Sequence, residues 1–285
     1  MTQHTATSAI HPAAGDAAAV GQRSRLARNL LTVSMIWRRE MIRLLRSRAR
    51  IVTGLAQPII YLFVMGVGLG QVIGSDRIPG VSYQEFLFPG VLAMSVLFSG
   101  MFSAISIVWD REFGFLKEML VAPVSRASIV LGKAIGGASQ AVAQGVILVV
   151  VAPLIGVTMS PLELLAMLAL LMLLAFAIVS FGIVIASRTQ RVEGFQVVMT
   201  LVAQPMLFLS GAIFPLQDLP TWLHVLTRLN PMTYGVDPVR RVILGDAGAL
   251  TLGGEVLPIW LEAVIVLGIG TAMLALAVRL FGREG

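Results

Sequence analysis

The stretch LELLAMLALLMLLAFAIVSFGIVIA, residues 162–186, decides the fold class of this sequence. It contains a single charged residue, Glu163, and about 20 apolar residues in helical form suffice to cross the hydrocarbon core of a bilayer. The chain as a whole is 57% hydrophobic and only 13% charged, whereas an ordinary soluble domain carries about 25% charged residues. We therefore predict an all-α membrane protein with six transmembrane helices, the other five at 51–73, 86–109, 129–157, 195–216 and 256–280.

The basic residues indicate how these helices are oriented. With the N-terminus inside, the inner segments hold 17 of the 21 Lys and Arg residues, nine of them before the first span, and the outer segments hold four. Lys and Arg accumulate on the cytoplasmic side of membrane proteins, so both termini are predicted to be cytoplasmic. The same distribution accounts for the net charge of +6 without a nucleic-acid partner.

The residues before the first span divide into two parts, ahead of a transmembrane domain at 51–285. Residues 1–22 are small and polar, and we predict a disordered cytoplasmic tail. Residues 23–50 predict an amphipathic helix lying in the membrane interface; the simpler interpretation is a basic flank that only orients the first span. The apolar face would comprise Leu26, Leu30, Val33, Trp37, Met41 and Leu44, and the opposite face Arg25, Arg28, Arg39, Arg43, Arg46 and Arg50.

A charged segment, WDREFGFLKEMLVAPVSR, separates the second and third spans at residues 109–126. Its charges alternate with Phe, Leu and Met, and Pro123 should end its helix before Ser125 caps the next one. A solvated connector is one interpretation of this segment. The density of apolar residues favours the other, a short cytoplasmic helix that docks into a groove of a soluble protein.

The segment 214–245 is the long outer connection between spans five and six. Leu219, Trp222, Leu223, Leu226 and Leu229 would form one apolar helix face, and Asn230-Pro231 would end that helix. Asp237 and Pro238 then suggest the N-cap and first residue of a second helix. We predict short re-entrant helices packed against the spans, acting either as a gate or as a structural cap.

Several kinds of chemistry are excluded by the residues present. The chain has no cysteine, and its three histidines are not spaced as metal ligands. The segment ASIVLGKA (127–134) lacks the residues of a Walker loop at both ends, so we expect no ATPase site, no metal and no enzymatic activity. Ionisable residues are scarce within the spans, where Glu163 and Glu262 should reach water at the outer boundary, which argues against ion-coupled transport.

Other residues in the spans suggest how the helices pack. Gly132 and Gly136, like Gly66 and Gly70, have the spacing that allows close helix packing. Four glutamines are expected to face inward and to form hydrogen bonds between helices: Gln140, Gln144, Gln196 and Gln204.

Three blocks of sequence, residues 83–104, 110–133 and 209–245, resemble in order and spacing the permease subunits of ABC-2-type exporters. The daunorubicin-resistance and nodulation-factor export permeases are the most similar branch, and the resemblance extends from about Leu26 to the end of the chain. It implies a dimer, formed with a second copy or a sibling permease, and two separate ABC ATPase subunits. ATP and Mg²⁺ would bind to those subunits, leaving no cofactor in this chain.

The resemblance also implies roles for particular residues. The coupling helix would comprise Asp110, Arg111, Glu112, Phe113, Gly114, Phe115, Leu116, Lys117, Glu118, Met119, Leu120 and Pro123. The interface helix would place Trp37, Arg39, Arg43 and Arg46 beside the ATPase. The outer gate would comprise Phe214, Pro215, Leu219, Pro220, Trp222, Asn230 and Pro231. The substrate route would run between two protomers, with Met94, Phe98, Phe102, Gln204, Met206 and Phe208 as candidate lining residues.

We therefore expect a permease subunit that exports an amphiphilic compound, a drug, glycolipid or lipid-linked sugar, across the cytoplasmic (inner) membrane. The alternative is a stand-alone transporter, either ion-coupled or passive. A membrane-embedded enzyme acting on lipid is a third hypothesis, for which Asp110, Arg111 and Glu112 form the candidate cluster.

Overall fold

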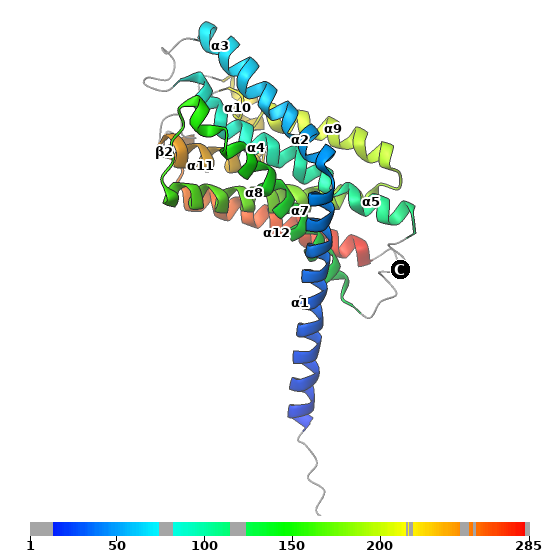
Figure 1. Cartoon of the computed structure of the whole chain (residues 1–285). Coiled ribbons are helices and arrows are strands. Elements are labelled where there is room, and N and C mark those ends of the chain that lie inside the picture. The colour runs from blue at the N-terminus through cyan, green and yellow to red at the C-terminus, as the bar shows by residue number, and fades with distance from the viewer. Residues whose placement is uncertain are drawn as a thin grey trace, which may run out of the picture.

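The computed structural model describes residues 14–73, 82–114, 124–214, 216, 219–245, 251–252 and 255–282. Within these residues the fold is all-helical apart from one hairpin of two-residue strands, β1 (Thr251–Leu252) and β2 (Glu255–Val256), which pair antiparallel. Long helices lie side by side in a bundle, and α1 projects away from it (Figure 1). The all-α class predicted from the sequence is confirmed for this part of the chain.

Most helices fall on predicted segments, but α1 begins at Ala14, within the segment 1–22 that was predicted to be a disordered tail. A π-helical turn at Tyr61–Met65 joins α2 to α3, just after Pro58 removes one backbone donor from α2. A single 3₁₀ turn, Ala152–Ile155, follows α7. The helices are α1 (Ala14–Arg46), α2 (Arg48–Ile60), α3 (Gly66–Ile73), α4 (Tyr83–Ser103), α5 (Ile105–Glu112), α7 (Arg126–Val149), α8 (Pro161–Arg188), α9 (Val192–Phe208), α10 (Thr221–Leu229), α11 (Thr233–Leu244) and α12 (Ile259–Gly282).

Side-chain caps fix the start of three of these helices. Ser82 and Ser160 each accept a hydrogen bond from the backbone N–H three residues later, and the Glu85 and Glu163 carboxylates accept one from the serine N–H. This reciprocal arrangement satisfies two backbone donors that a helix start leaves without partners. Ser125 accepts from the Ser128 N–H at 3.1 Å, which confirms the predicted cap of α7.

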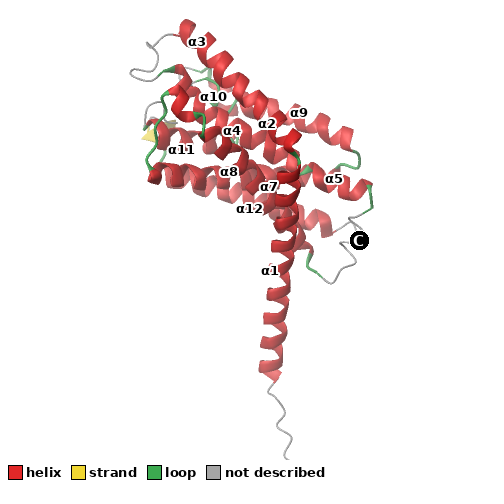
Figure 2. Ribbon diagram, in the orientation of Figure 1, coloured by secondary structure: helices red, strands yellow, loops and turns green. Residues whose placement is uncertain are grey.

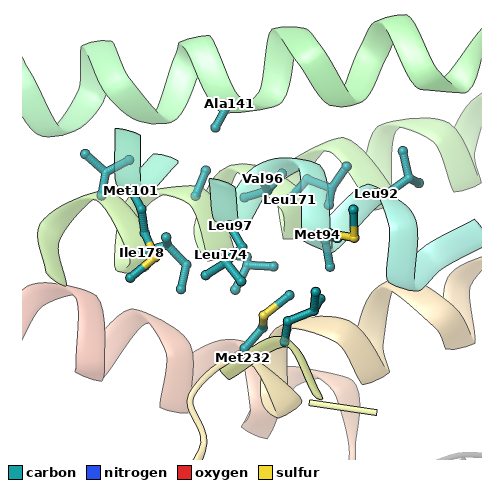
Figure 3. Packing of buried hydrophobic residues seen from close by; sticks show 14 of the residues in the cluster. Leu92, Met94, Val96, Leu97, Met101, Ala141, Leu171, Leu174, Ile178 and Met232 are labelled. Atoms are coloured by element: carbon teal, nitrogen blue, oxygen red, sulfur yellow. The ribbon is translucent and has the colours of Figure 1, made fainter. Parts of the chain in front are cut away.

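Helix α4 lies at the centre of the bundle and is buried along most of its length. Its side chains pack against α7, α8 and the segment that precedes α11 (Figure 3). Glycines allow the close approach: a Cβ on Gly137 of α7 would lie 2.3 Å from Ser103 Oγ of α4. The residues labelled in this core are Leu92, Met94, Val96, Leu97, Met101, Ala141, Leu171, Leu174, Ile178 and Met232.

Four helical segments of the described chain are long and apolar enough to cross a membrane: Ile51–Gly68, Tyr83–Glu112, Pro161–Arg188 and Ile259–Phe281. They coincide with four of the six predicted spans. The other two predicted spans correspond to α7, which is not among the four, and to the shorter apolar helix α9. The protein is therefore a multi-pass membrane protein, while the count of six spans stays a prediction.

Candidate functional site

A cluster of charged side chains is buried where α1, α5 and α7 meet. Lys133 Nζ of α7 lies 2.5 Å from Asp110 Oδ2 of α5 and 3.7 Å from Glu40 Oε1 of α1, and it donates to Ser106 Oγ at 3.1 Å. Arg39 Nη2 reaches the same Asp110 oxygen at 3.0 Å. Only 4% of the Lys133 side chain is exposed. Burial of a charge is tolerated only when it is paired and hydrogen-bonded, and each of these groups meets that condition.

The approach of α1 to α7 depends on two glycines. A Cβ on Gly132 would lie 2.9 Å from the Ile36 Cβ, and one on Gly136 would lie 3.0 Å from the Glu40 Cβ. The pair Gly132 and Gly136, noted in the sequence for its spacing, therefore forms the groove that seats α1. Across the same contact the Trp37 ring N–H donates to Ser139 Oγ at 3.1 Å.

Gln140 adds a hydrogen bond to the contact between α1 and α7, which confirms the prediction that this glutamine bonds between helices. Gln140 Nε2 of α7 donates to the Glu40 backbone oxygen of α1 at 2.8 Å. Glu40 Oε1 also lies 3.5 Å from Arg43 Nη1. We refer to Arg39, Glu40, Asp110 and Lys133 together as the inner charge cluster.

Arg111 fastens the end of α5 to the end of α8. Its guanidinium donates to the backbone oxygens of Ala186 at 3.1 Å, Ser187 at 3.1 Å and Thr189 at 2.7 Å. The last carbonyls of a helix have no partners within the helix and carry partial negative charge, so a cation there is favourable. The start of the segment between α5 and α7 is thus attached to a second span.

The predicted coupling residues divide into three groups. Asp110 and Arg111 point into the chain and make the contacts just described. Glu112 and Phe113 are exposed, Phe113 to 70%, and Gly114 has a φ of 82° that suits a residue without a side chain. The rest lie outside the described residues: Phe115, Leu116, Lys117, Glu118, Met119, Leu120 and Pro123.

The predicted interface helix corresponds to α1, which covers Ala14–Arg46 and is separated from α2 at Ser47. Trp37, Arg39 and Arg43 all contact the inner charge cluster or α7, and Arg46 is exposed. The proposed apolar face is split by the structure, because Leu44 is buried while Leu26 and Leu30 are exposed.

At the opposite end of the bundle, Asn230 organises the junction between α10 and α11. Its Nδ2 donates to the Met206 oxygen at 2.7 Å, and its Oδ1 accepts from the Met232 N–H at 3.1 Å. Thr233 Oγ1 donates to the Thr227 and Leu209 oxygens. The Asn-Pro break after α10 therefore holds α11 against the end of α9.

The predicted start of the second outer helix was wrong by about one turn. Helix α11 begins at Thr233, and Asp237 and Pro238 lie inside it. Met232 stands at the N-cap position and makes no side-chain cap; the contacts of Asn230 and Thr233 hold the start of this helix instead. Pro238 is the sixth residue of α11, so it lies beyond the first turn and removes one backbone donor from this helix.

The predicted gate residues occupy both faces of this outer segment. Asn230 is buried, Phe214, Leu219 and Pro231 are half-buried, and Pro215 lies outside the described residues. Pro220 and Trp222 are exposed, Trp222 to 66%, and so are Leu226 and Leu229 farther along α10. One face of α10 is therefore apolar and not covered by the described part of this chain.

A second buried group of charges, which the sequence did not indicate, lies where α11 meets α12. Arg240 Nη2 donates to the Gly211 oxygen at 2.6 Å, and its guanidinium carbon lies 4.1 Å from the centre of the Phe86 ring. Burial lowers the pKa of Arg240 to about 10, so it stays protonated at neutral pH. Asp237 and Glu262 interact with each other beside it.

Two expectations about carboxylates in the spans were wrong. Glu262 is fully buried rather than in reach of water, because α11 covers the start of α12. The view that ionisable residues are nearly absent fails as well, since Asp110 lies within a span segment and Lys133 within the adjacent helix. Glu262 interacts with Asp237 and Arg241, and Asp237 interacts with Arg240, so each carboxylate has a cation near it, as a buried structural charge requires.

A cavity of about 320 Å³ lies between α2, α4, α5, α7 and α9, with Leu44 of α1 at its edge. Phe98 and Phe102, two of the predicted route residues, line it. Met94 does not, because its side chain is buried in the core around α4 (Figure 3). Gln204 and Met206 are half-buried and Phe208 is exposed elsewhere on α9. No three His, Cys, Asp or Glu side chains in the described ranges gather closely enough to hold a metal ion.

Comparison with known proteins agrees with this architecture. The family described as ABC-2 type transporter matches residues 32–244. Nodulation protein J of Rhizobium leguminosarum bv. trifolii is 35% identical over 213 residues, which cover 74% of this chain and 80% of the relative. Nodulation protein J of Rhizobium meliloti (strain 1021) is 33% identical over 242 residues, which cover 84% of this chain and 91% of the relative. The ycf38 transport permease of Cyanophora paradoxa is 30% identical over 207 residues, 71% of each chain. The chain therefore belongs to the ABC-2 type transporter family, as its sequence motifs had suggested.

Proposed function

We propose that this protein is the membrane subunit of an ATP-driven exporter for an amphiphilic compound, and that a separate ATPase subunit supplies the energy. The observation that carries the proposal is the position of the inner charge cluster. Asp110 and Arg111 are the first residues of the segment expected to dock on the ATPase, and they contact α1, α7 and α8. A displacement of that segment would therefore act on three helices at once.

The same contacts suggest how docking is divided among residues. Glu112 and Phe113 are exposed at the beginning of the segment, where an apolar side chain beside a charge can be buried in a partner's groove. Asp110 and Arg111 are already engaged within the chain and would position the segment. In this proposal ATP and Mg²⁺ bind to the ATPase, and the permease supplies only the mechanical connection.

In the membrane, α2 with α3, α4 with α5, α7, α8, α9 and α12 would form the six spans. Both termini would face the cytoplasm, which agrees with the concentration of Lys and Arg in the inner segments. The apolar residues that α1 leaves exposed, among them Leu30 and Met35, would lie in the lipid interface. The uncovered face of α10 would meet a second permease subunit and close the outer mouth.

The first test is purification of the tagged chain from its native membrane in mild detergent, with identification of the bound proteins. The proposal expects a stoichiometric ATPase that is retained by Glu193→Arg and lost in Glu112→Arg. Both carboxylates are exposed on the predicted cytoplasmic side, so the two variants change charge equally. An ATPase-free oligomer that moves solute in response to an ion gradient would contradict the proposal and favour a stand-alone transporter.

A further inference from the structure

The cavity between α2, α4, α5, α7 and α9 has an unusual lining for a site within a membrane bundle. Four glutamines reach it, Gln57 from α2, Gln140 and Gln144 from α7, and Gln196 from α9, together with Ser99 and Ser103 of α4. Gln140 and Gln144 are buried, whereas Gln57 and Gln196 are exposed on helices that lie on one side of the bundle (Figure 1). Polar side chains are costly against lipid, so their convergence on one cavity indicates a polar occupant.

The glutamines determine what kind of polar group can bind. An amide offers an oxygen acceptor and two N–H donors, so it can bind a hydroxyl or another amide in either direction. Gln140 donates one hydrogen bond to the Glu40 backbone oxygen, and it lines the cavity beside that contact. Gln57 and Gln196 are exposed and line the cavity from two different helices, α2 and α9, so both amides are available to a ligand.

Aromatic side chains supply the remaining walls. Phe98 and Phe102 come from α4 and Trp109 from α5, and Phe102 is 42% exposed. Aromatic faces pack well against flat apolar surfaces, and they bind cations as well. The aromatic residues alone therefore do not separate a neutral ligand from a cationic one.

The charge of the lining residues distinguishes a neutral ligand from a cationic one. Among the described residues that line the cavity none is ionisable. The nearest carboxylates, Glu40 and Asp110, are held by Lys133, Arg39 and Arg43 in the inner charge cluster. A charged headgroup in this cavity would lose its hydration without gaining a counter-ion, which is costly. A neutral group rich in hydroxyls or amides loses less and gains hydrogen bonds.

We propose that this cavity binds the headgroup of the transported amphiphile, and that this headgroup is neutral and carries several hydroxyl or amide groups. The proposal rests on the proposed transport function and narrows its substrate class. Gln57 and Gln196 would hydrogen-bond the headgroup, and Phe98 and Phe102 would contact its apolar face.

Binding can be measured without transport, because Trp109 lies in the cavity and only three other tryptophans occur in the chain. The triple variant with Phe at Trp37, Trp222 and Trp260 leaves Trp109 as the fluorescent reporter. The protein in lipid nanodiscs is titrated with hexyl glucoside, hexyltrimethylammonium and hexyl sulfate, which share one chain and differ in headgroup. We expect a saturable change in fluorescence with hexyl glucoside, at least tenfold weaker binding of the two ions, and about tenfold weaker glucoside binding in Gln57→Leu/Gln196→Leu.

Two variants complete the design. Gln84→Leu is the matched control, because Gln84 lies on α4 but does not line the cavity, and it should bind hexyl glucoside normally. Gly54→Val should abolish binding, since a side chain there enters the cavity beside Gln144.

Tighter binding of hexyltrimethylammonium, equal binding of all three probes, no saturable binding or an equal loss in Gln84→Leu would each overturn the proposal. If the protein binds hexyl glucoside selectively but purifies without an ATPase, the proposed ATP-driven transport is wrong and the proposed headgroup site is supported. If the ATPase is bound and glucoside selectivity is missing, the site fails while the mechanism stands.

Discussion

Replacing Lys133 with Met removes the cation at the centre of the inner charge cluster and keeps an unbranched side chain of similar length. Loss of one partner of a buried ion pair usually costs about 3–5 kcal/mol, because the other charge stays buried. Here Asp110 retains Arg39 at 3.0 Å and Glu40 retains Arg43 at 3.5 Å. We therefore expect a loss of roughly 2–3 kcal/mol in the free energy of unfolding.

The assay is thermal unfolding of the purified protein, with Arg188→Met as the control. Arg188 is an exposed cation at the end of α8, and surface substitutions of this kind usually change stability by less than about 0.5 kcal/mol. At about 2–4 °C per kcal/mol for a chain of this size, Lys133→Met should lower the Tm by about 4–12 °C.

A double-mutant cycle tests whether the loss arises from the pair itself. If Lys133 and Asp110 stabilise each other, Asp110→Asn/Lys133→Met should lose at least about 1 kcal/mol less than the sum of the two single variants. Additive losses, or a loss in Lys133→Met no larger than in Arg188→Met, would refute the reasoning.

Three further predictions concern the outer half of the bundle. A Cβ on Gly90 would lie 1.8 Å from the Ala212 backbone oxygen, so Gly90→Ala should lower the free energy of unfolding by more than about 2 kcal/mol. A Cβ on Gly68 meets nothing within 4 Å, so Gly68→Ala is the control and should keep or raise the Tm. Asn230→Ala removes two hydrogen bonds at the α10–α11 junction and should cost about 1–3 kcal/mol, with faster proteolysis of that segment as the readout; wild-type protease resistance would contradict it. Arg240→Leu removes the cation that interacts with buried Asp237, together with its hydrogen bond to the Gly211 oxygen, and should cost about 3–5 kcal/mol in thermal unfolding; a Tm within 2 °C of wild type would argue against the compensating role.

Much of this fold could be predicted from the sequence because the bilayer imposes simple rules. The run at 162–186 became α8 at Pro161–Arg188, since a long apolar stretch has few alternatives to a helix in lipid. Composition does not determine which face of a membrane helix points into the bundle. Met94 was therefore assigned to the substrate route, although its side chain packs in the core.

The charged clusters could not be predicted, because their members come from separate helices. Lys133 and Asp110 are 23 positions apart and Glu40 is far from both along the chain. From the sequence, Asp110 was assigned to the coupling helix, Lys133 was counted only among the inner charges, and Glu40 was given no role. Only the packing of α1 onto Gly132 and Gly136 brings them together, and Glu262 similarly becomes buried only when α11 folds over α12.

The most direct test of the central claim, that this permease is driven through the segment after α5, uses the absence of cysteine from the chain. Phe113→Cys places a single thiol at an exposed position of that segment, and Glu163→Cys places one at the start of α8, on the predicted outer side. The account predicts that a bifunctional thiol reagent cross-links position 113, and not position 163, to an ATPase subunit in native membranes, with a yield that changes when ATP is added. Cross-linking to an ATPase from position 163, or none from position 113 while the ATPase copurifies, would contradict it.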